Sequence, residues 1–194
     1  MKQFRFSTAL SGLALLIALG GCTIYTHESK GESGKKNEDV DIRTPVGSLS
    51  VHSGDVDARA TGLSVYPGAR VTTGHRDNDS SANVNIDTSF FGVKVVAVKF
   101  SSDDAPDKIL AFYRKDMAKY GNLIECDTKT TSFQVKKHNA DAPVTCDDNG
   151  GRRSAKELKA GIESNQHVVA VEPKGSGSEF ALVFVRLRDT KDTI

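Results

Sequence analysis

Apolar and polar residues alternate along several segments of this 194-residue chain, and the alternation predicts strands. In residues 82–87 the apolar positions Ala82, Val84 and Ile86 are separated by polar ones, which is typical of a strand with one buried and one wet face. Residues 93–100 carry apolar side chains on both faces. This second pattern indicates a strand in the middle of a sheet or under a covering layer.

Further strands are predicted on both sides of this pair. Residues 40–52 read as two short strands joined at Thr44-Pro45-Val46-Gly47, with Pro placed for a turn and Gly for a left-handed position. Residues 167–171 and 179–187 form a clear final hairpin. Weaker strand patterns occupy residues 131–137 and 156–162, the latter being ambiguous between a strand and a helical turn.

The period changes after residue 100, where the spacing predicts a helix over about residues 104–120. Asp104 is a suitable N-cap, Pro106 fits the first turn, and Gly121 is the expected stop. The apolar stripe that should lie on the sheet consists of Ile109, Leu110, Tyr113, Met117 and Tyr120, with Phe112 at its border. The chain therefore predicts an α+β fold, a mostly antiparallel sheet with one main helix packed on it. We expect a single α+β domain over residues 40–188 and a polar tail over 189–194.

The N-terminus has the features of an export signal. It has a basic start at Lys2 and Arg5 and an apolar run over about residues 9–19, too short to span a bilayer. Residues 19–22 read LGGC and resemble the lipobox of bacterial lipoproteins. The resemblance implies that residues 1–21 are removed as a lipoprotein signal peptide and that Cys22 becomes the acylated N-terminus, a palmitate-type membrane anchor. The alternative is a plain secretory signal with a chance cysteine.

The lipobox resemblance also bears on localisation. In enterobacteria an Asp after the lipidated Cys retains the protein at the inner membrane, and Thr23 stands there in this chain. We therefore expect the periplasmic face of the outer membrane if the host has two membranes. Residues 23–39 are polar and lack periodicity, so together with Cys22 they are predicted to form a disordered tether, with a root-mean-square span of roughly 20–25 Å.

Two cysteines remain in what would be an oxidising compartment. Cys126 and Cys146 lie 20 positions apart and are predicted to form a structural disulfide, which would stabilise the fold by about 3 kcal/mol. The alternatives are a redox-active pair, for which a C-x-x-C spacing would be more natural, or two free or metal-binding thiols.

Charge and motifs narrow the function without naming one. The formal net charge is +1 with no dominant basic patch, which argues against nucleic-acid binding. The five histidines show no metal-ligand spacing, so no metal or cofactor is expected. His167 begins a predicted strand and is interpreted as a hydrogen-bonded structural histidine. No catalytic motif occurs, so an enzyme is not expected, although a site assembled from distant residues would escape this test.

Four further segments carry a resemblance to a family of uncharacterised bacterial envelope lipoproteins. They are TPVG (residues 44–47), YPGA (66–69), FFGVKVVAVKF (90–100) and ILAFYRKDMAKYG (109–121). The similarity covers most of residues 40–188. It implies an α+β domain and offers no catalytic residues.

These observations lead to three hypotheses about function. The first is a lipid-anchored periplasmic lipoprotein, attached to the membrane through its N-terminal lipid, that acts as a non-enzymatic binding or accessory module for another envelope protein or component. The second is a carrier or sensor of a small apolar ligand held between helix and sheet, with Tyr66, Phe112 and Tyr113 near the mouth of the site. The third is an unrecognised hydrolase.

Overall fold

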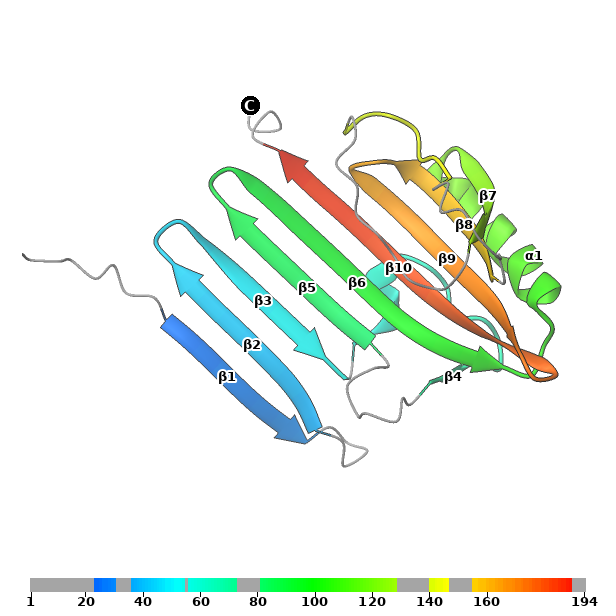
Figure 1. Ribbon diagram of the computed structural model, residues 1–194, viewed down its shortest axis with the longest axis horizontal. Helices are drawn as coiled ribbons and strands as arrows, with labels where there is room; N and C mark the ends of the chain where they lie inside the picture. The colour runs from blue at the N-terminus through cyan, green and yellow to red at the C-terminus, as the bar shows by residue number, and fades with distance from the viewer. Residues whose placement is uncertain are drawn as a thin grey trace, which may run out of the picture.

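One broad antiparallel sheet dominates the structure, a computed structural model that describes residues 23–30, 36–54, 56–72, 81–128, 140–146 and 155–189 (Figure 1). The ten strands are β1 (Thr23–Lys30), β2 (Lys36–Thr44), β3 (Gly47–Ser53), β4 (Arg70–Val71), β5 (Ser81–Thr88), β6 (Phe91–Ser102), β7 (Leu123–Thr128), β8 (Ala155–Ile162), β9 (Asn165–Lys174) and β10 (Gly177–Asp189). The helices of the described residues are α1 (Pro106–Met117) and two short 3-10 helices, η1 (Ala58–Thr61) and η2 (Ala118–Tyr120).

The sheet consists of two meanders joined at its centre. Its order is β1-β2-β3-β5-β6-β10-β9-β8-β7, with β4 paired to β6, and every pairing is antiparallel. The joint is the pairing of β6 with β10, and both strands carry apolar residues on both faces. Strands of that kind belong in the interior of a sheet. The prediction of a mostly antiparallel sheet with one helix packed on it is confirmed.

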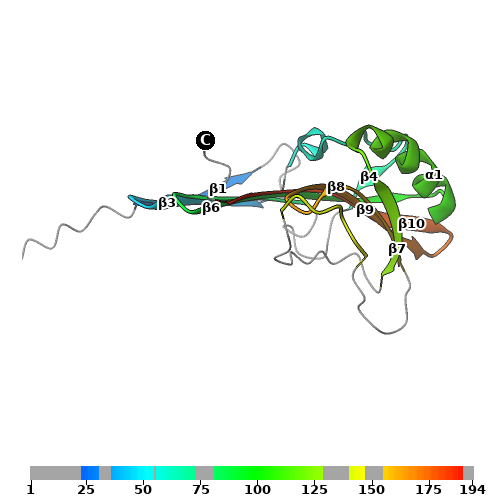
Figure 2. The same ribbon diagram turned by 90° about the horizontal axis from the view of Figure 1, so that it is seen from above.

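Helix α1 covers only one part of one face. After β6 the chain crosses that face, and α1 contacts β9 and β8 before the chain reaches the edge strand β7. Seen edge-on, α1 lies at one end of the sheet, whereas the region of β1 and β3 extends beyond it (Figure 2). The face that carries α1 is called the helix face below, and the other the open face.

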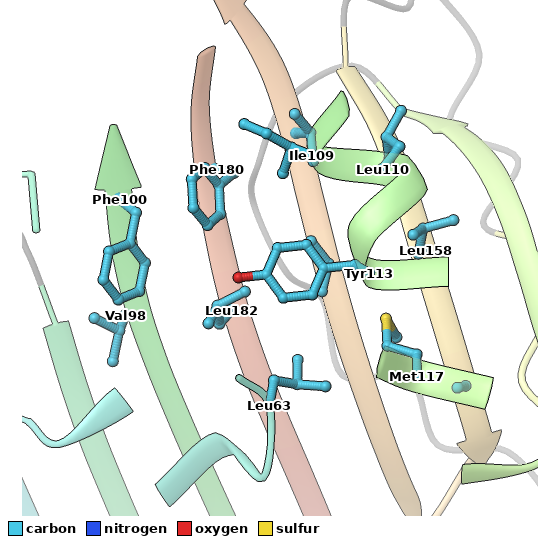
Figure 3. Packing of buried hydrophobic residues seen from close by; sticks show 13 residues of the cluster. Leu63, Val98, Phe100, Ile109, Leu110, Tyr113, Met117, Leu158, Phe180 and Leu182 are labelled. Atoms are coloured by element: carbon cyan, nitrogen blue, oxygen red, sulfur yellow. The ribbon is translucent and has the colours of Figure 1, made fainter. Parts of the chain in front are cut away.

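The main core lies between α1 and the helix face (Figure 3). Its buried side chains come from α1, from four neighbouring strands and from Leu63 in the loop after η1. The phenyl rings of Phe100 and Phe180 stack with centroids 5.4 Å apart. The cluster comprises Leu63, Val98, Phe100, Ile109, Leu110, Tyr113, Met117, Leu158, Ala160, Val169, Val171, Phe180 and Leu182. The predicted apolar stripe of the helix thus packs as expected, with Tyr120 only partly buried.

The open face has a smaller buried cluster and the disulfide. The buried cluster lies on β9 and β10 and consists of Val168, Ala181, Val183 and Val185. Cys126 of β7 is bonded to Cys146, with Cα atoms 5.5 Å apart, which confirms the predicted pairing. The bond attaches the segment 140–146, which runs beside the end of β8 through a bridge between Pro143 and Ile162.

The start of α1 differs from the sequence prediction. Its N-cap is Ala105, which makes no side-chain hydrogen bond, and Pro106 occupies the first turn. The carboxylate of Asp104 instead accepts hydrogen bonds from the Tyr66 hydroxyl at 2.9 Å and from Lys108 Nζ at 2.7 Å. These partners compete with capping for the same oxygens. Gly121 ends the helical region with a φ of 96°, as expected of a stop.

The segment expected to be a tether is paired into the sheet instead. Strand β1 and the first residues of β2 fall within residues 23–39, and Ile24 pairs with Ile42 in their antiparallel register. The β-branched and aromatic residues Ile24, Tyr25 and Thr26 favour extended backbone, and pairing with β2 satisfies their backbone groups. The prediction of a disordered coil is therefore wrong for 23–30 and 36–39.

Other strand predictions are confirmed, but Gly47 is required for a different reason from the one predicted. The hairpin at residues 44–47 is present, but Gly47 has no positive φ. Glycine is needed there because a Cβ would lie 2.5 Å from the carbonyl oxygen of Asp87 on the neighbouring strand. The ambiguous segment 156–162 is a strand, β8, and the last hairpin is β9 and β10. The signal peptide, Cys22, the predicted strand at 131–137 and the tail beyond Asp189 lie outside the described residues.

Truncating the core should destabilise the domain strongly. Leu182→Ala removes a fully buried side chain beneath α1, and we expect a loss of about 2–5 kcal/mol in the free energy of unfolding. Val46→Ala, at a side chain that is 64% exposed, should change it by less than about 0.5 kcal/mol. Urea denaturation followed by circular dichroism measures both, and similar losses in the two variants would contradict the described core.

Breaking the disulfide should also cost stability. It closes a loop of 20 positions, so its removal by Cys126→Ser and Cys146→Ser together should lower the free energy of unfolding by about 3 kcal/mol. The same denaturation experiment on the double variant measures the loss. An unchanged midpoint would mean that the bond does not restrain the unfolded chain.

Candidate functional site

The three aromatic residues predicted to line a ligand site do meet in the structure. The ring of Phe112 makes edge-to-face contacts with Tyr66, at 5.3 Å between centroids, and with Tyr113, at 5.0 Å. Tyr66 comes from the Tyr66–Ala69 turn, which closes through a hydrogen bond from the Ala69 N–H to the Tyr66 carbonyl. The spacing of apolar residues along the helix predicted the positions of Phe112 and Tyr113 on α1. Tyr66, from the turn, packs against Phe112.

Their packing leaves little room for a ligand. Tyr113 is fully buried, and its hydroxyl donates to the carbonyl of Ser64 at 3.0 Å. Burial raises the pKa of this phenol well above its usual range. Phe180 packs against both tyrosines, so a molecule between α1 and the sheet would have to displace core side chains. The ligand site at these residues stays a prediction.

A cavity of about 390 Å³ opens at a different place, where η2 meets the start of β9. Its described lining is Tyr120, Gly121, Asn122, Pro143, Gly161, Ile162, Asn165 and His167. The His167 imidazole stacks on the Tyr120 ring at 3.5 Å between centroids, and its Nδ1 lies 2.9 Å from the carbonyl oxygen of Thr61. The Tyr120 hydroxyl donates to the carbonyl of Gly62, so the same loop holds both rings.

The chemistry of this cavity depends on the protonation of His167. A carbonyl can only accept, so Nδ1 carries the proton, and in the neutral ring Nε2 is then an acceptor. Burial lowers the pKa of His167 below its ordinary value of 6.5, and Lys119 adds to this effect while the Thr61 carbonyl and Asp116 oppose it. The described lining holds no serine, cysteine or carboxylate beside this imidazole. This imidazole is suited to hydrogen bonding.

A second candidate site is the open face over the N-terminal meander. In an antiparallel register paired residues lie on the same face, so successive strand pairs bring their apolar residues together. We call this surface the apolar half-face. It consists of Ile24, Val40, Ile42, Leu49, Val51, Ala82, Val84, Ile86, Val93, Val95, Ala97 and Leu187.

Burial and charge distinguish the two sides of this half of the sheet. Ile24 is 62% exposed, and the other side chains of the apolar half-face are half-buried. No helix of the described residues lies on this side, because α1 and η1 contact strands on the helix face. The helix face of the same strands is polar and includes Asp41, Arg43, Ser48, Ser50, His52, Asn83, Asn85, Asp87 and Lys94.

Part of this surface was predicted from the sequence. The alternation in residues 82–87 predicted an apolar side for β5, but the register that aligns Ile42, Leu49, Ile86 and Val93 in one row is not visible along the chain. Among the described residues no three His, Cys, Asp or Glu are placed to hold a metal ion. None of the described helices has the length and hydropathy of a membrane span.

Acidification should destabilise the fold through His167. The unfolded imidazole takes up a proton below about pH 6.5, whereas the folded one does so only at lower pH. The free energy of unfolding should therefore fall as the pH drops below about 6.5, through the window between the two pKa values. His167→Gln should flatten this dependence in urea denaturation at a series of pH values. The same slope in both proteins would contradict a lowered pKa.

Comparison of the chain with family models, with curated proteins and with solved structures found no match. The candidate sites therefore rest on the geometry of this chain. They are the apolar half-face and the cavity at His167.

Proposed function

We propose that this protein is a lipid-anchored lipoprotein of the cell envelope, held at the periplasmic face of the outer membrane where the host has one, and that it binds another envelope protein through the apolar half-face. The export signal and the LGGC sequence ending at Cys22 support the lipid attachment and the envelope location. Two rows of apolar side chains carry the binding role, one from Ile24 to Val93 and one from Val40 to Val95, on a face without a helix among the described residues.

An apolar surface that no helix of the described residues covers favours association. Monomeric proteins rarely expose large contiguous apolar patches, and such patches mark interaction sites. Fully burying one Val, Leu or Ile side chain contributes about 1.5–3 kcal/mol, and the half-buried side chains here still have part of that gain to make. A second sheet could lie about 10 Å above this one, with side chains interdigitating. A partner that presents an apolar sheet or helix face is the chemistry that fits.

The position of β1 supports a location of this surface close to the membrane. Because Thr23 is already paired with Arg43, the residue after Cys22 belongs to the sheet. The lipid would then attach at the edge of the domain rather than at the end of a long coil. Such an attachment would restrict the orientation of the apolar half-face and favour partners that lie near the same membrane.

A second candidate function is the carriage or sensing of a small ligand, favoured by the cavity at His167. Its volume of about 390 Å³ falls in the range of small-molecule sites. Native mass spectrometry of the protein purified from cells tests it, since a carrier should retain a ligand of defined mass. Loss of that mass in His167→Phe would assign it to the cavity, and a bare protein mass would exclude it. Hydrolysis comes third, because the described lining pairs no nucleophile with His167.

In-cell photo-cross-linking should identify the partner. A photoreactive amino acid at Val84, on the apolar half-face, should capture one envelope protein, because this side chain lies between Val51 and Val95. The same amino acid at Asn85, the next residue of β5, points to the opposite face and serves as the matched control. Mass spectrometry of the cross-linked product names the protein captured.

The anchor enters this experiment through Cys22→Ser, which is expected to be exported without lipid. Capture at Val84 should weaken in that variant, because the domain would no longer be concentrated at the membrane. Equal capture at Val84 and Asn85, or none at Val84, would contradict a binding role for the apolar half-face.

A further inference from the structure

The end of the sheet nearest Cys22 carries a second cluster of exposed apolar residues. Thr23 starts β1 beside Arg43, and the β2–β3 turn lies immediately beyond Arg43. The register then continues this row across the sheet, through Ser48 and Asp87 to Gly92. The chain therefore emerges from residue 22 at the same end as the β2–β3 and β5–β6 turns (Figure 1).

These two turns expose large apolar side chains. Val46 is 64% exposed in the first and Phe90 is 67% exposed in the second, where Phe91, the first residue of β6, is 46% exposed. Ile24 and Tyr25, both 62% exposed, lie two and three residues after Cys22. Five of the eight large exposed apolar side chains among the described residues thus gather at one end of the sheet. We call Val46, Phe90 and Phe91 the apolar tip.

In both turns of the apolar tip, a threonine hydroxyl makes hydrogen bonds to the turn backbone. In the first, Thr44 Oγ1 accepts from the Val46 N–H at 3.3 Å and donates to the Gly47 carbonyl at 2.9 Å. Thr88 plays this part in the second turn: its Oγ1 accepts from the Phe90 N–H at 3.2 Å and donates to the Phe91 carbonyl at 2.8 Å.

A hydrogen bond also links the two turns, from the Ser89 N–H to the Val46 carbonyl at 3.4 Å. The backbone groups are thus satisfied within the two turns, and the apolar side chains project from them. Two adjacent rigid turns that present Val46 and Phe90 outward form a surface with little ordering entropy left to lose on binding.

Basic side chains lie one step behind the apolar tip. Lys94 and Arg186 are directly paired across β6 and β10, both are exposed, and neither has an ion-pair partner among the described residues. Like charges placed opposite each other destabilise a sheet, and a shared anion would relieve that cost. Lys94 is four residues from Phe90, about 13 Å along a strand, so its side chain could reach a phosphate while Phe90 sits 5–10 Å deeper in the lipid.

We propose that the apolar tip inserts into the interfacial region of the phospholipid leaflet that holds the acyl chains of Cys22, with Lys94 and Arg186 close to lipid phosphates. The strands then stand on the membrane, and the apolar half-face points sideways into the periplasm. This inference rests on the proposed lipid attachment at Cys22. It adds an orientation, since an acyl chain alone holds a domain near a membrane without fixing which surface faces it.

Tryptophan fluorescence tests the insertion, because the chain contains no tryptophan. Phe90→Trp gives a single reporter at the tip, and Ser176→Trp gives the matched control in the exposed β9–β10 turn at the opposite end of the sheet. The lipidated protein is reconstituted in vesicles of phosphatidylethanolamine and phosphatidylglycerol with or without brominated acyl chains. We expect a blue shift and strong quenching for Phe90→Trp, and neither for Ser176→Trp.

Three further measurements distinguish a failure of the insertion from a failure of the lipid anchor. The mass of the N-terminal peptide shows whether Cys22 carries lipid, independently of the tip. Val46→Trp repeats the depth measurement in the neighbouring turn, in case Phe90→Trp misfolds. The unlipidated Cys22→Ser chain carrying Phe90→Trp, titrated with the same vesicles, should still show quenching, at a lipid concentration at least about tenfold higher.

Unquenched tip variants in the lipidated protein would overturn the insertion while leaving the anchor standing. A blue shift that depends on protein concentration and comes without quenching would mean that a second copy covers the tip, and would also overturn it. Absence of lipid on Cys22 would refute the anchor, and the Cys22→Ser titration would then decide the insertion alone.

Discussion

The width of the sheet exceeds what one helix can cover, and the remaining features of the molecule follow from this mismatch. Nine strands in one path at a spacing of about 4.8 Å span roughly 38 Å, whereas the twelve residues of α1 are about 18 Å long. The pairing of β6 with β10 makes the sheet this wide, because it joins two meanders that would otherwise be separate. Since α1 carries the chain from β6 to the far edge at β7, it covers only the C-terminal meander. The N-terminal meander is left with a polar face and an apolar one.

Stability and interaction are therefore assigned to different halves of one sheet. Between α1 and the sheet, the side chains of Tyr113, Phe180 and Leu182 are fully buried. The disulfide at Cys126 holds the edge strand β7 of the same half. In the other half, the side chains of Val51 and Val84 are only half-buried. The sheet is continuous from one half to the other through the pairing of β6 with β10, so the rigid core can hold the apolar half-face flat and in register. A binding surface built on strands in this way loses little entropy when a partner covers it.

Local patterns predicted the elements well and their assembly poorly. The alternation in β5, the apolar runs of β6 and β10 and the stripe of α1 are properties of neighbouring residues, and they were readable from the chain. The pairing of β1 with β2 was not, because their polar composition outweighs a short alternation around Ile24 until a partner strand is present. Asp104 was assigned to a cap for the same reason, since its actual partner Tyr66 lies 38 positions away. The sequence predicted an apolar side for β5, but the full extent of the apolar half-face could not be read from it, because that depends on the register of six strands.

The proposed binding role requires that the apolar half-face is covered in the cell. Its most direct test is the reactivity of a single thiol at Val84→Cys, with Asn85→Cys as the control on the opposite face of the same strand. With Cys126 and Cys146 bonded to each other, and Cys22 acylated as proposed, the introduced cysteine is the one free thiol. A small water-soluble maleimide should label Val84→Cys rapidly in the purified protein and slowly in permeabilised cells, whereas Asn85→Cys should react alike in both. Equal labelling of Val84→Cys in cells and in isolation would contradict the account.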